Sequence, residues 1–294
     1  MTSAAESPMN NKESLLSRLA KFFDRRGFRW GLSLAATIYS RFQTGTFIKV
    51  FFDGAWGHRN KSVVFFDRRI NLALSYDRCR SVTMDHWLFL YKPKQRDVII
   101  DIGAGLGVET FFFSKLVGPE GKIFSIEANP PTFACLQKMS SSNKLDNVVL
   151  LNLAIHHDST SVYIDDPEVH VNASILNTKG GYEVSGETLD SLVRQWELPE
   201  IAFVKMNIEG AERLAVRGMT DMIKMVKYLC ISCHDFISER DGNEYMRTKK
   251  VIREFLADNG LCIVTRDDDP RAWIRDQLNA YNPKLCQPSS KLEG

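Results

Sequence analysis

From about residue 93 onward, short apolar runs alternate with segments whose apolar residues recur at helical spacing. The apolar runs predict buried strands, and the segments between them predict amphipathic helices. Regular alternation of this kind is typical of a parallel sheet with right-handed crossovers, so it indicates an α/β fold. The predicted strands cover 97–101, 122–127, 148–153, 201–207, 226–233 and 261–265. The predicted helices cover 108–117, a segment opening at Pro130, 188–196, 211–217 and 247–259.

Two segments depart from the alternation. Residues 158–186 contain short β-like runs and a Gly180-Gly181 pair, which predicts a hairpin-like excursion rather than another crossover. Residues 272–278 predict a last strand. The runs within the excursion are 161–164, 174–176 and 182–184.

The first ninety or so residues differ in character. Leucines and phenylalanines between residues 15 and 23 stand at helical spacing, and this helix is interrupted near Gly27. Aromatic-rich runs predict strands over 47–52 and 63–66, and a helix is predicted over 77–91. We therefore predict four parts: a disordered start (1–12), an N-terminal lobe (13–92), the α/β domain (93–280) and a C-terminal tail (281–294).

A basic and aromatic stretch lies in this lobe. Its arginines and lysine interleave with large aromatic residues, which is the composition of a helix resting on an anionic membrane surface. The alternative is a helix that packs on its own domain with solvated arginines. The residues are Arg18, Lys21, Phe22, Phe23, Arg25, Arg26, Phe28, Arg29 and Trp30.

Composition narrows the class of protein. The chain has 294 residues, of which 44% are hydrophobic and 25% charged, as in an ordinary globular protein. The net charge of +2 provides no global field that would attract nucleic acid. The longest apolar segment of the lobe is too short to span a bilayer, and the start lacks a signal peptide, so we expect a cytoplasmic protein. Cys230 and Cys233 would point to opposite faces of one strand, which favours reduced, buried thiols over a metal site.

The residues with the clearest chemical meaning follow the first predicted strand of the α/β domain. Asp101 ends this strand, and Gly103, Gly105 and Gly107 follow at alternate positions. Glycines permit unusual backbone angles and let a ligand approach the main chain, and the following helix N-terminus offers free N–H groups. Glu127 ends the next strand, 24 positions after Gly103, where a ribose diol would bind.

Dinucleotide-binding proteins share this logic, so the glycine turn alone does not identify the ligand. Three details favour a nucleoside sulfonium, S-adenosyl-L-methionine, over NAD. The spacing is G-x-G-x-G and not G-x-G-x-x-G, an acidic residue precedes the turn, and about ninety residues of other sequence precede the whole motif.

These motifs resemble the FkbM family of S-adenosylmethionine-dependent methyltransferases. The resemblance covers about residues 90–280. It implies a class I methyltransferase fold, which is Rossmann-like with a seven-stranded, mostly parallel sheet in the order 3-2-1-4-5-7-6. The matching blocks are Val98-Ile-Ile-Asp-Ile-Gly-Ala-Gly-Leu-Gly107, Ile126-Glu-Ala-Asn-Pro130, Asn152-Leu-Ala-Ile155, Glu187-Thr-Leu-Asp-Ser-Leu192 and Phe203-Val-Lys-Met-Asn-Ile-Glu-Gly-Ala-Glu212.

The resemblance also implies roles for individual residues in cofactor binding. The three glycines would face the methionine part of the cofactor, with Glu109 near its amino group, while Glu127 would hold the ribose. Adenine would be flanked by Ala128 and Asn129 and touched by Leu153 and Ala154. Asp101 and Asn207 complete the predicted set.

Asn207 is a departure, because the family usually has Asp at this position. An asparagine can hydrogen-bond to cofactor or substrate, but it cannot act as a base and is a poor metal ligand. We therefore expect no metal at the site.

Several residues are candidates for catalysis. His234 follows a predicted strand at the edge where α/β sheets bind ligands, so it is the first candidate for a general base; the alternative is a structural histidine paired with Asp235. Glu209 and Glu212 share one helical face and either line the pocket or favour the helix N-terminus by charge. Other polar groups are expected at the surface: His156 and His157 on a loop, and Asp85 and His86 on a helix, the last two with an alternative position over the cofactor.

The predicted function is O-methylation of a hydroxyl on a sugar, a glycolipid or a polyketide-like small molecule, and this acceptor class comes from the resemblance alone. Two alternatives remain open. One is an NAD-dependent oxidoreductase that uses the same glycine turn and Glu127. The other is a non-catalytic methyltransferase fold that binds a membrane or a protein partner through its N-terminal lobe. The oligomeric state is not predicted.

Overall fold

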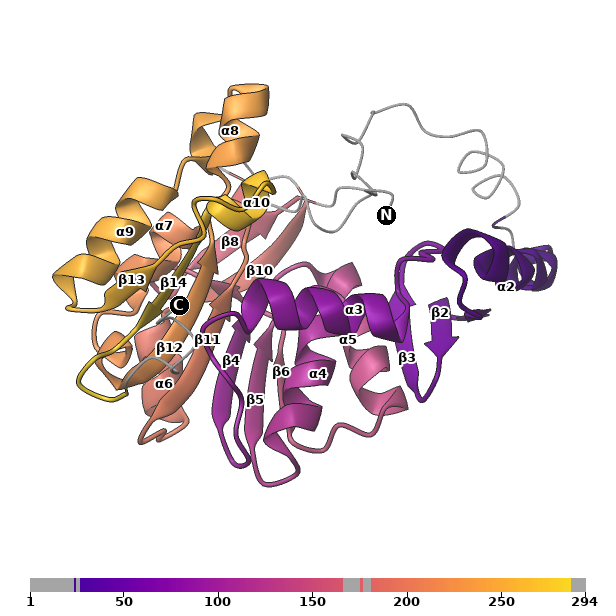
Figure 1. Ribbon diagram of the computed structural model, residues 1–294, viewed down its shortest axis with the longest axis horizontal. Coiled ribbons are helices and arrows are strands. Elements are labelled where there is room, and N and C mark those ends of the chain that lie inside the picture. The colour runs from indigo at the N-terminus through magenta and orange to yellow at the C-terminus, as the bar shows by residue number, and fades with distance from the viewer. Residues whose placement is uncertain (1–23, 25–26, 166–174, 177–180, 287–294) are drawn as a thin grey trace.

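The computed structural model describes Asp24 and residues 27–165, 175–176 and 181–286. The expected disordered start (1–12), the helix expected from residue 14 and the last part of the tail (287–294) lie outside the described residues. Figure 1 shows a large α/β unit joined to a smaller lobe that contains α2.

Within the described residues, seven strands form the central sheet in the order β13-β14-β12-β11-β4-β5-β6. β14 is antiparallel to both of its neighbours, and the other pairings are parallel. This is the predicted order of a class I methyltransferase, so the fold prediction is confirmed. The strands are β4(Val98–Ile102), β5(Lys122–Ile126), β6(Val148–Leu151), β11(Ile201–Met206), β12(Val226–Ser232), β13(Cys262–Val264) and β14(Gln277–Tyr281).

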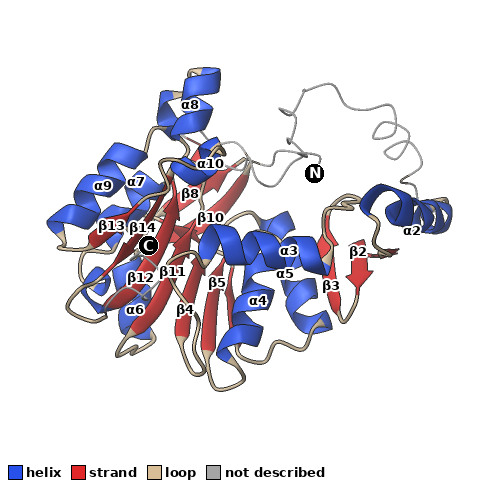
Figure 2. Ribbon diagram, in the orientation of Figure 1, coloured by secondary structure: helices blue, strands red, loops and turns tan. Residues whose placement is uncertain are grey.

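Helices cover both faces of the sheet (Figure 2). The apolar residues of three helices pack with β11 and β12 in the largest core cluster, while α4 packs on the other face with Trp87 and Tyr91. α5 begins with two prolines, and the side chain of Asn129 caps it by accepting from Thr132 N at 3.1 Å. The helices are α4(Val108–Val117), α5(Pro130–Ser142), α6(Leu189–Gln195), α7(Glu212–Ala215) and α9(Lys249–Asp258), with 3-10 turns at Val216–Gly218, Met222–Met225 and Glu244–Met246.

The N-terminal lobe packs on the α/β unit through β3 and α5. Asn143, at the end of α5, pairs with both the N–H and the C=O of Val64 through its side chain. In addition, Phe65 stacks edge-on with Phe111 of α4. The elements of the lobe are α2(Arg29–Thr44), β1(Lys49–Asp53), β2(Ala55–Asn60), β3(Val63–Asp67), α3(Tyr76–Val82) and the π-helical turn Thr83–Trp87.

The excursion between β6 and α6 forms a separate small sheet. β8 and β10 are antiparallel, as expected for a hairpin, and β10 also pairs in parallel with β7. In the described part of the chain, this sheet has the order β7-β10-β8-β9. Its strands are β7(Ala154–Ile155), β8(Ser161–Ile164), β9(Ile175–Leu176) and β10(Tyr182–Glu187).

Two local predictions need correction, and two elements were missed. The strand expected over 272–278 is a short helix, α10(Ala272–Arg275), followed by β14. The helix expected over 77–91 ends at Trp87 in a π-helical turn. Two elements were not predicted: β2, whose sequence is largely polar, and α8(Asp235–Asp241). In each case tertiary contacts outweigh local preference: α10 lies beside an arginine cluster bound by Asp269, and β2 pairs on both sides.

No described helix is both long and apolar enough to cross a lipid bilayer.

Candidate active site

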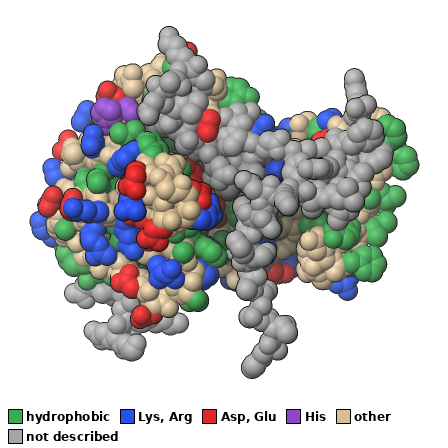
Figure 3. Space-filling model, turned by 90° about the horizontal axis from the view of Figure 1, so that it is seen from above, with side chains coloured by type: hydrophobic (Ala, Val, Ile, Leu, Met, Phe, Trp, Pro, Cys, Tyr) green, Lys and Arg blue, Asp and Glu red, His purple; other side chains and the backbone are tan. Residues whose placement is uncertain are grey.

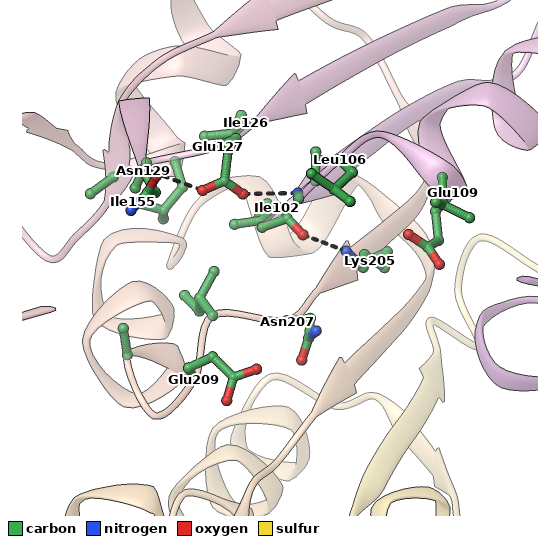
Figure 4. A pocket seen from close by; sticks show the side chains of 18 of the residues that line it. Ile102, Leu106, Glu109, Ile126, Glu127, Asn129, Ile155, Lys205, Asn207 and Glu209 are labelled. Carbon is green, nitrogen blue, oxygen red and sulfur yellow. Dashed lines mark hydrogen bonds between the residues drawn. The ribbon is translucent and has the colours of Figure 1, made fainter. Parts of the chain in front are cut away.

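A cavity of about 370 Å³ opens at the carboxyl ends of β4, β5, β6 and β11, where α/β sheets bind ligands (Figure 4). The excursion and the N-terminal lobe also contribute residues to its wall. Ten residues that were predicted from the sequence line this cavity, together with Ala104 of the glycine turn. The ten are Gly103, Gly105, Glu109, Glu127, Ala128, Asn129, Leu153, Ala154, Asn207 and Glu209. From the lobe come Asn71, Leu74 and Trp87.

The glycine turn is held against the neighbouring strands. The backbone N–H groups of Gly103 and Ala104 both donate to the carbonyl of Ile126 at 2.9 Å. Gly103 has φ +70°, and a Cβ added there would lie 2.0 Å from the carbonyl oxygen of Asn207. Only glycine fits this position, because a side chain would be strained and would also collide with backbone.

Glu127 is held in the cavity wall by two backbone donors. Its Oε2 accepts from Gly105 N and its Oε1 from Asn129 N, both at 2.8 Å. Burial raises the pKa of Glu127, and the two backbone donors offset part of this effect. The geometry therefore holds both carboxylate oxygens in place at the wall of the cavity.

A buried lysine lies below the glycine turn and was not assigned a role from the sequence. Lys205 is 2% exposed, lies 3.0 Å from Asp101 Oδ1 and donates to the Gly103 carbonyl at 2.7 Å. Its Nζ lies 5.0 Å from the centre of the Trp87 ring. Burial acts to lower the pKa of Lys205, but Asp101 and Glu109 act in the opposite direction and the net shift is upward. The available signal was a lysine inside an otherwise apolar strand.

Glu109 faces the cavity from the first turn of α4. Burial raises its pKa, and Lys205 counteracts part of the shift. Trp87 hydrogen-bonds to the Glu109 carboxylate and is brought there by the π-helical turn. Such turns are common at functional sites. A buried carboxylate of this kind favours a cationic ligand group.

The turn after β11 presents two polar side chains to the cavity, Asn207 and Glu209. Glu209 has φ +51°, an uncommon backbone conformation for a residue with a side chain. Glu212 stabilises the turn, since its two oxygens accept from Ile208 N and Gly210 N at 3.0 Å each. Of the two glutamates left open by the sequence, Glu209 therefore lines the cavity and Glu212 is buried behind it.

His234 lies behind these glutamates and is 3% exposed. Its Nε2 lies 3.5 Å from Glu209 Oε2 and its Nδ1 lies 3.3 Å from Glu212 Oε1. Burial lowers the pKa of His234, but the two carboxylates outweigh it and raise the pKa to about 10. An imidazolium has no free lone pair, so at neutral pH His234 cannot accept a proton, and it does not line the cavity. The expected pairing with Asp235 is also absent, because Asp235 accepts from the backbone of Thr248 and Lys249.

The charge of His234 has a measurable consequence for stability. Because the folded pKa lies above the ordinary value of 6.5, this histidine stabilises the fold fully below about pH 6.5, and the contribution is lost as pH rises to about 10. We expect the difference in unfolding free energy between the wild type and His234→Gln to shrink over this interval by about 1.4 kcal/mol for each unit of the raised pKa. Urea unfolding at several pH values measures it. His157→Gln, at an exposed histidine, is the control, and parallel curves for wild type and His234→Gln would contradict the assignment.

Two residues of the predicted cofactor set lie away from the cavity. Asp101 is fully buried and accepts from Thr110 Oγ1 at 2.7 Å, so it faces Lys205 and not the cavity. Gly107 faces α5, where an added Cβ would lie 2.3 Å from Met139 Cε. Gly107 therefore permits close packing between α4 and α5.

The remaining polar candidates are placed as follows. His156 lies on the expected loop but is buried and not at the surface, with its Nδ1 2.6 Å from Asp158 Oδ1, while His157 is exposed as expected. Asp85 pairs with Arg266 and Arg271, as a residue on the helix surface. Cys230 and Cys233 are free, buried thiols whose pKa values burial raises.

Comparison with known proteins identifies the family. The model of the methyltransferase FkbM domain matches residues 101–261. The chain belongs to the FkbM methyltransferase family. It is therefore a methyltransferase whose methyl donor is S-adenosylmethionine, and the nicotinamide-dependent alternative is set aside.

The chain of this FkbM methyltransferase is also similar to individual proteins, in sequence or in structure. It is 24% identical over 183 residues to the hexuronic acid methyltransferase AglP of Haloferax volcanii, covering 62% of this chain and 72% of AglP. A solved FkbM methyltransferase from Methylobacillus flagellatus matches with 17% identity and a TM-score of 0.44, over 63% of this chain and 43% of that one. Fibrillarin from Aeropyrum pernix, solved with bound S-adenosylmethionine, matches with 13% identity and a TM-score of 0.41, over 78% and 94%. The FkbM methyltransferase described here thus spans less than half the length of the Methylobacillus structure.

Proposed function

We propose that this enzyme transfers a methyl group from S-adenosylmethionine to a hydroxyl group of a sugar. The observation that carries the proposal is one cavity in which the Glu127 carboxylate, fixed by two backbone donors, lines the wall together with the polar side chains of Asn207 and Glu209. The sugar class is supported by the similarity to AglP, which is named for hexuronic acid.

The residues of the cavity wall support a role toward each part of the cofactor. Each Glu127 oxygen accepts one backbone hydrogen bond and keeps a lone pair for a ribose hydroxyl. Glu109 suits the ammonium group, since a cation would compensate its buried charge. The apolar surface for adenine would come from Ala128, Leu153 and Ala154, with Asn129 beside them, and the methionine part would lie along Gly103 and Gly105.

Bound S-adenosylmethionine supplies an electrophilic methyl group. The chain has to hold the acceptor oxygen in line with that methyl and to remove its proton. Glu209 is the carboxylate that lines the cavity beside Asn207. We therefore propose that Glu209 accepts the proton of the acceptor hydroxyl. His234, whose Nε2 lies 3.5 Å from Glu209 Oε2, would orient the Glu209 carboxylate, and the Asn207 amide, which lines the same cavity, would hydrogen-bond to the acceptor.

Calorimetry tests the cofactor site. The wild type is expected to bind S-adenosylmethionine and S-adenosylhomocysteine, and Glu127→Gln to bind them about 100-fold more weakly, because two charge-assisted hydrogen bonds to the ribose are lost. Glu120→Gln, the same change at an exposed glutamate, is the control. If folded wild type binds neither ligand, the function fails; if Glu127→Gln binds as tightly as wild type, only the residue assignment fails.

The acceptor is tested in the same preparation. Hexuronic acid glycosides incubated with the enzyme and S-adenosylmethionine are expected to gain the mass of one methylene group. A neutral hexose glycoside and a polyketide-like alcohol serve as competing acceptors. Methylation of the alcohol alone would overturn the sugar class without affecting the cofactor site.

A further inference from the structure

Helix α2 packs on the neighbouring strand β1 partly through hydroxyl side chains. Thr37 Oγ1 accepts from Val50 N at 2.9 Å, and Ser40 Oγ accepts from Ile48 N at 3.0 Å. β1 is the edge strand of the three-stranded sheet, so these hydroxyls satisfy N–H groups that an edge leaves unpaired. The inner face of α2 thus combines these hydroxyl groups with Leu32 and Ala36, which pack against the cluster of Ile48, Val50 and Trp56.

The outward face of α2 is apolar. Its residues at intervals of four form a row along the helix, which we name the α2 row: Trp30, Leu34, Ile38 and Phe42, with exposed fractions of 74%, 55%, 53% and 80%. Figure 3 shows hydrophobic side chains gathered at the end of the molecule where Figure 1 places α2.

No comparable patch occurs elsewhere in the described residues. Phe28, Tyr39 and Phe47 flank the α2 row. In the rest of the described chain, no large hydrophobic side chain is more than 39% exposed. A groove of about 760 Å³ between α2 and β1 opens beside the row and is lined by Trp30, Leu34 and Phe47 among others. A contiguous apolar surface of this kind marks an interaction site.

The charges around the row indicate what covers it. Between residues 27 and 52 the charged residues are Arg29, Arg41 and Lys49, with no Asp or Glu. From residue 12 to 52 the sequence has eight Lys or Arg and two Asp or Glu. Two copies of the chain meeting through this face would bring like charges together, whereas an anionic lipid surface complements them.

We propose that the α2 row docks this enzyme on the surface of a membrane that contains anionic lipid. Trp30 and Phe42, near the two ends of the row, insert between the headgroups, and the basic residues face the lipid phosphates. The helix lies in the plane of the interface and does not cross it. The proposal does not depend on which acceptor the enzyme methylates.

Vesicle flotation of the full chain tests this docking. The wild type is expected to float with vesicles of phosphatidylcholine and phosphatidylglycerol, to float less with phosphatidylcholine alone, and to be released by high salt. Trp30→Ser/Phe42→Ser is expected to lower the partition coefficient at least about tenfold, because two large apolar side chains are lost. Val251→Ser, on α9, is the control for an exposed apolar residue and should float like the wild type. Unchanged affinity for S-adenosylmethionine shows that each variant is folded.

Three results would overturn the proposal. The wild type fails to float with the anionic vesicles, or the double variant floats as well as the wild type. The third result is that, in sedimentation velocity without lipid, the wild type is an oligomer and the double variant is a monomer. A second copy of the chain would then be the partner of the α2 row.

Discussion

Replacing Glu209 with glutamine is expected to lower kcat by about 10²–10⁴-fold, the usual contribution of a positioned base, and to leave the affinity for S-adenosylmethionine unchanged. Glutamine keeps the shape of the side chain and its place in the cavity wall but cannot take the proton of the acceptor hydroxyl. The adjacent His234 is buried behind this glutamate and does not line the cavity, so we do not expect it to replace the lost carboxylate.

Single-turnover rates and calorimetry on the same preparations separate the possible outcomes. Glu239→Gln, an identical change at an exposed position of α8, controls for the loss of one negative charge. A Glu209→Gln enzyme with wild-type kcat would move the base to another residue. Weaker cofactor binding with an unchanged rate would assign Glu209 to the cofactor instead.

Replacing Lys205 with methionine is expected to lower the free energy of unfolding by about 3–5 kcal/mol. Lys205 is the cation beside Asp101 and also donates to the Gly103 carbonyl, so its removal leaves a buried carboxylate and a backbone acceptor without their partner. Methionine fills a similar volume, which limits the contribution of a cavity to the measured loss.

Urea unfolding measures this loss, with Lys224→Met as the control. Lys224 pairs with Asp221 at the surface, where both side chains are more than two-thirds exposed, so its replacement is expected to cost less than about 1 kcal/mol. Lys205→Met/Asp101→Asn is expected to recover part of the loss, because the unpaired carboxylate is neutralised. Equal stability of Lys205→Met and Lys224→Met would show that the buried pair contributes nothing.

Most strands of the sheet were predictable because they carry an apolar run and the parallel crossovers have a helical period, whereas the strand order was implied by the resemblance to the FkbM family. The apolar run over 97–101 and the glycines after it predict both a buried strand and the turn at its end. By contrast, the small polar strand β2 and the helix α10 have no such local signal. Their conformations depend on pairing partners and on ion pairs with distant residues.

The candidate site divides in the same way. Glu127 was predictable from its place at the end of the second strand, and the structure brings it to the Gly105 N–H. Gly107 has the same residue type and spacing as its neighbours but faces α5, since a turn reverses the direction of the chain within a few residues. Spacing along a sequence indicates which residues share an element, and it does not indicate which side of a turn they face.

By itself, the sequence determined the fold class, the family and the position of the glycine turn and its acidic partner, because these follow from local periodicity and from short motifs. Only the tertiary structure decided which of two neighbouring glutamates lines the cavity, that Lys205 pairs with Asp101 beneath it, and that two carboxylates raise the pKa of His234. It also decided that α2 presents its apolar side outward. Charge states and exposed faces depend on groups that are distant in the chain and close in space, and electrostatic and packing energies act over spatial distance.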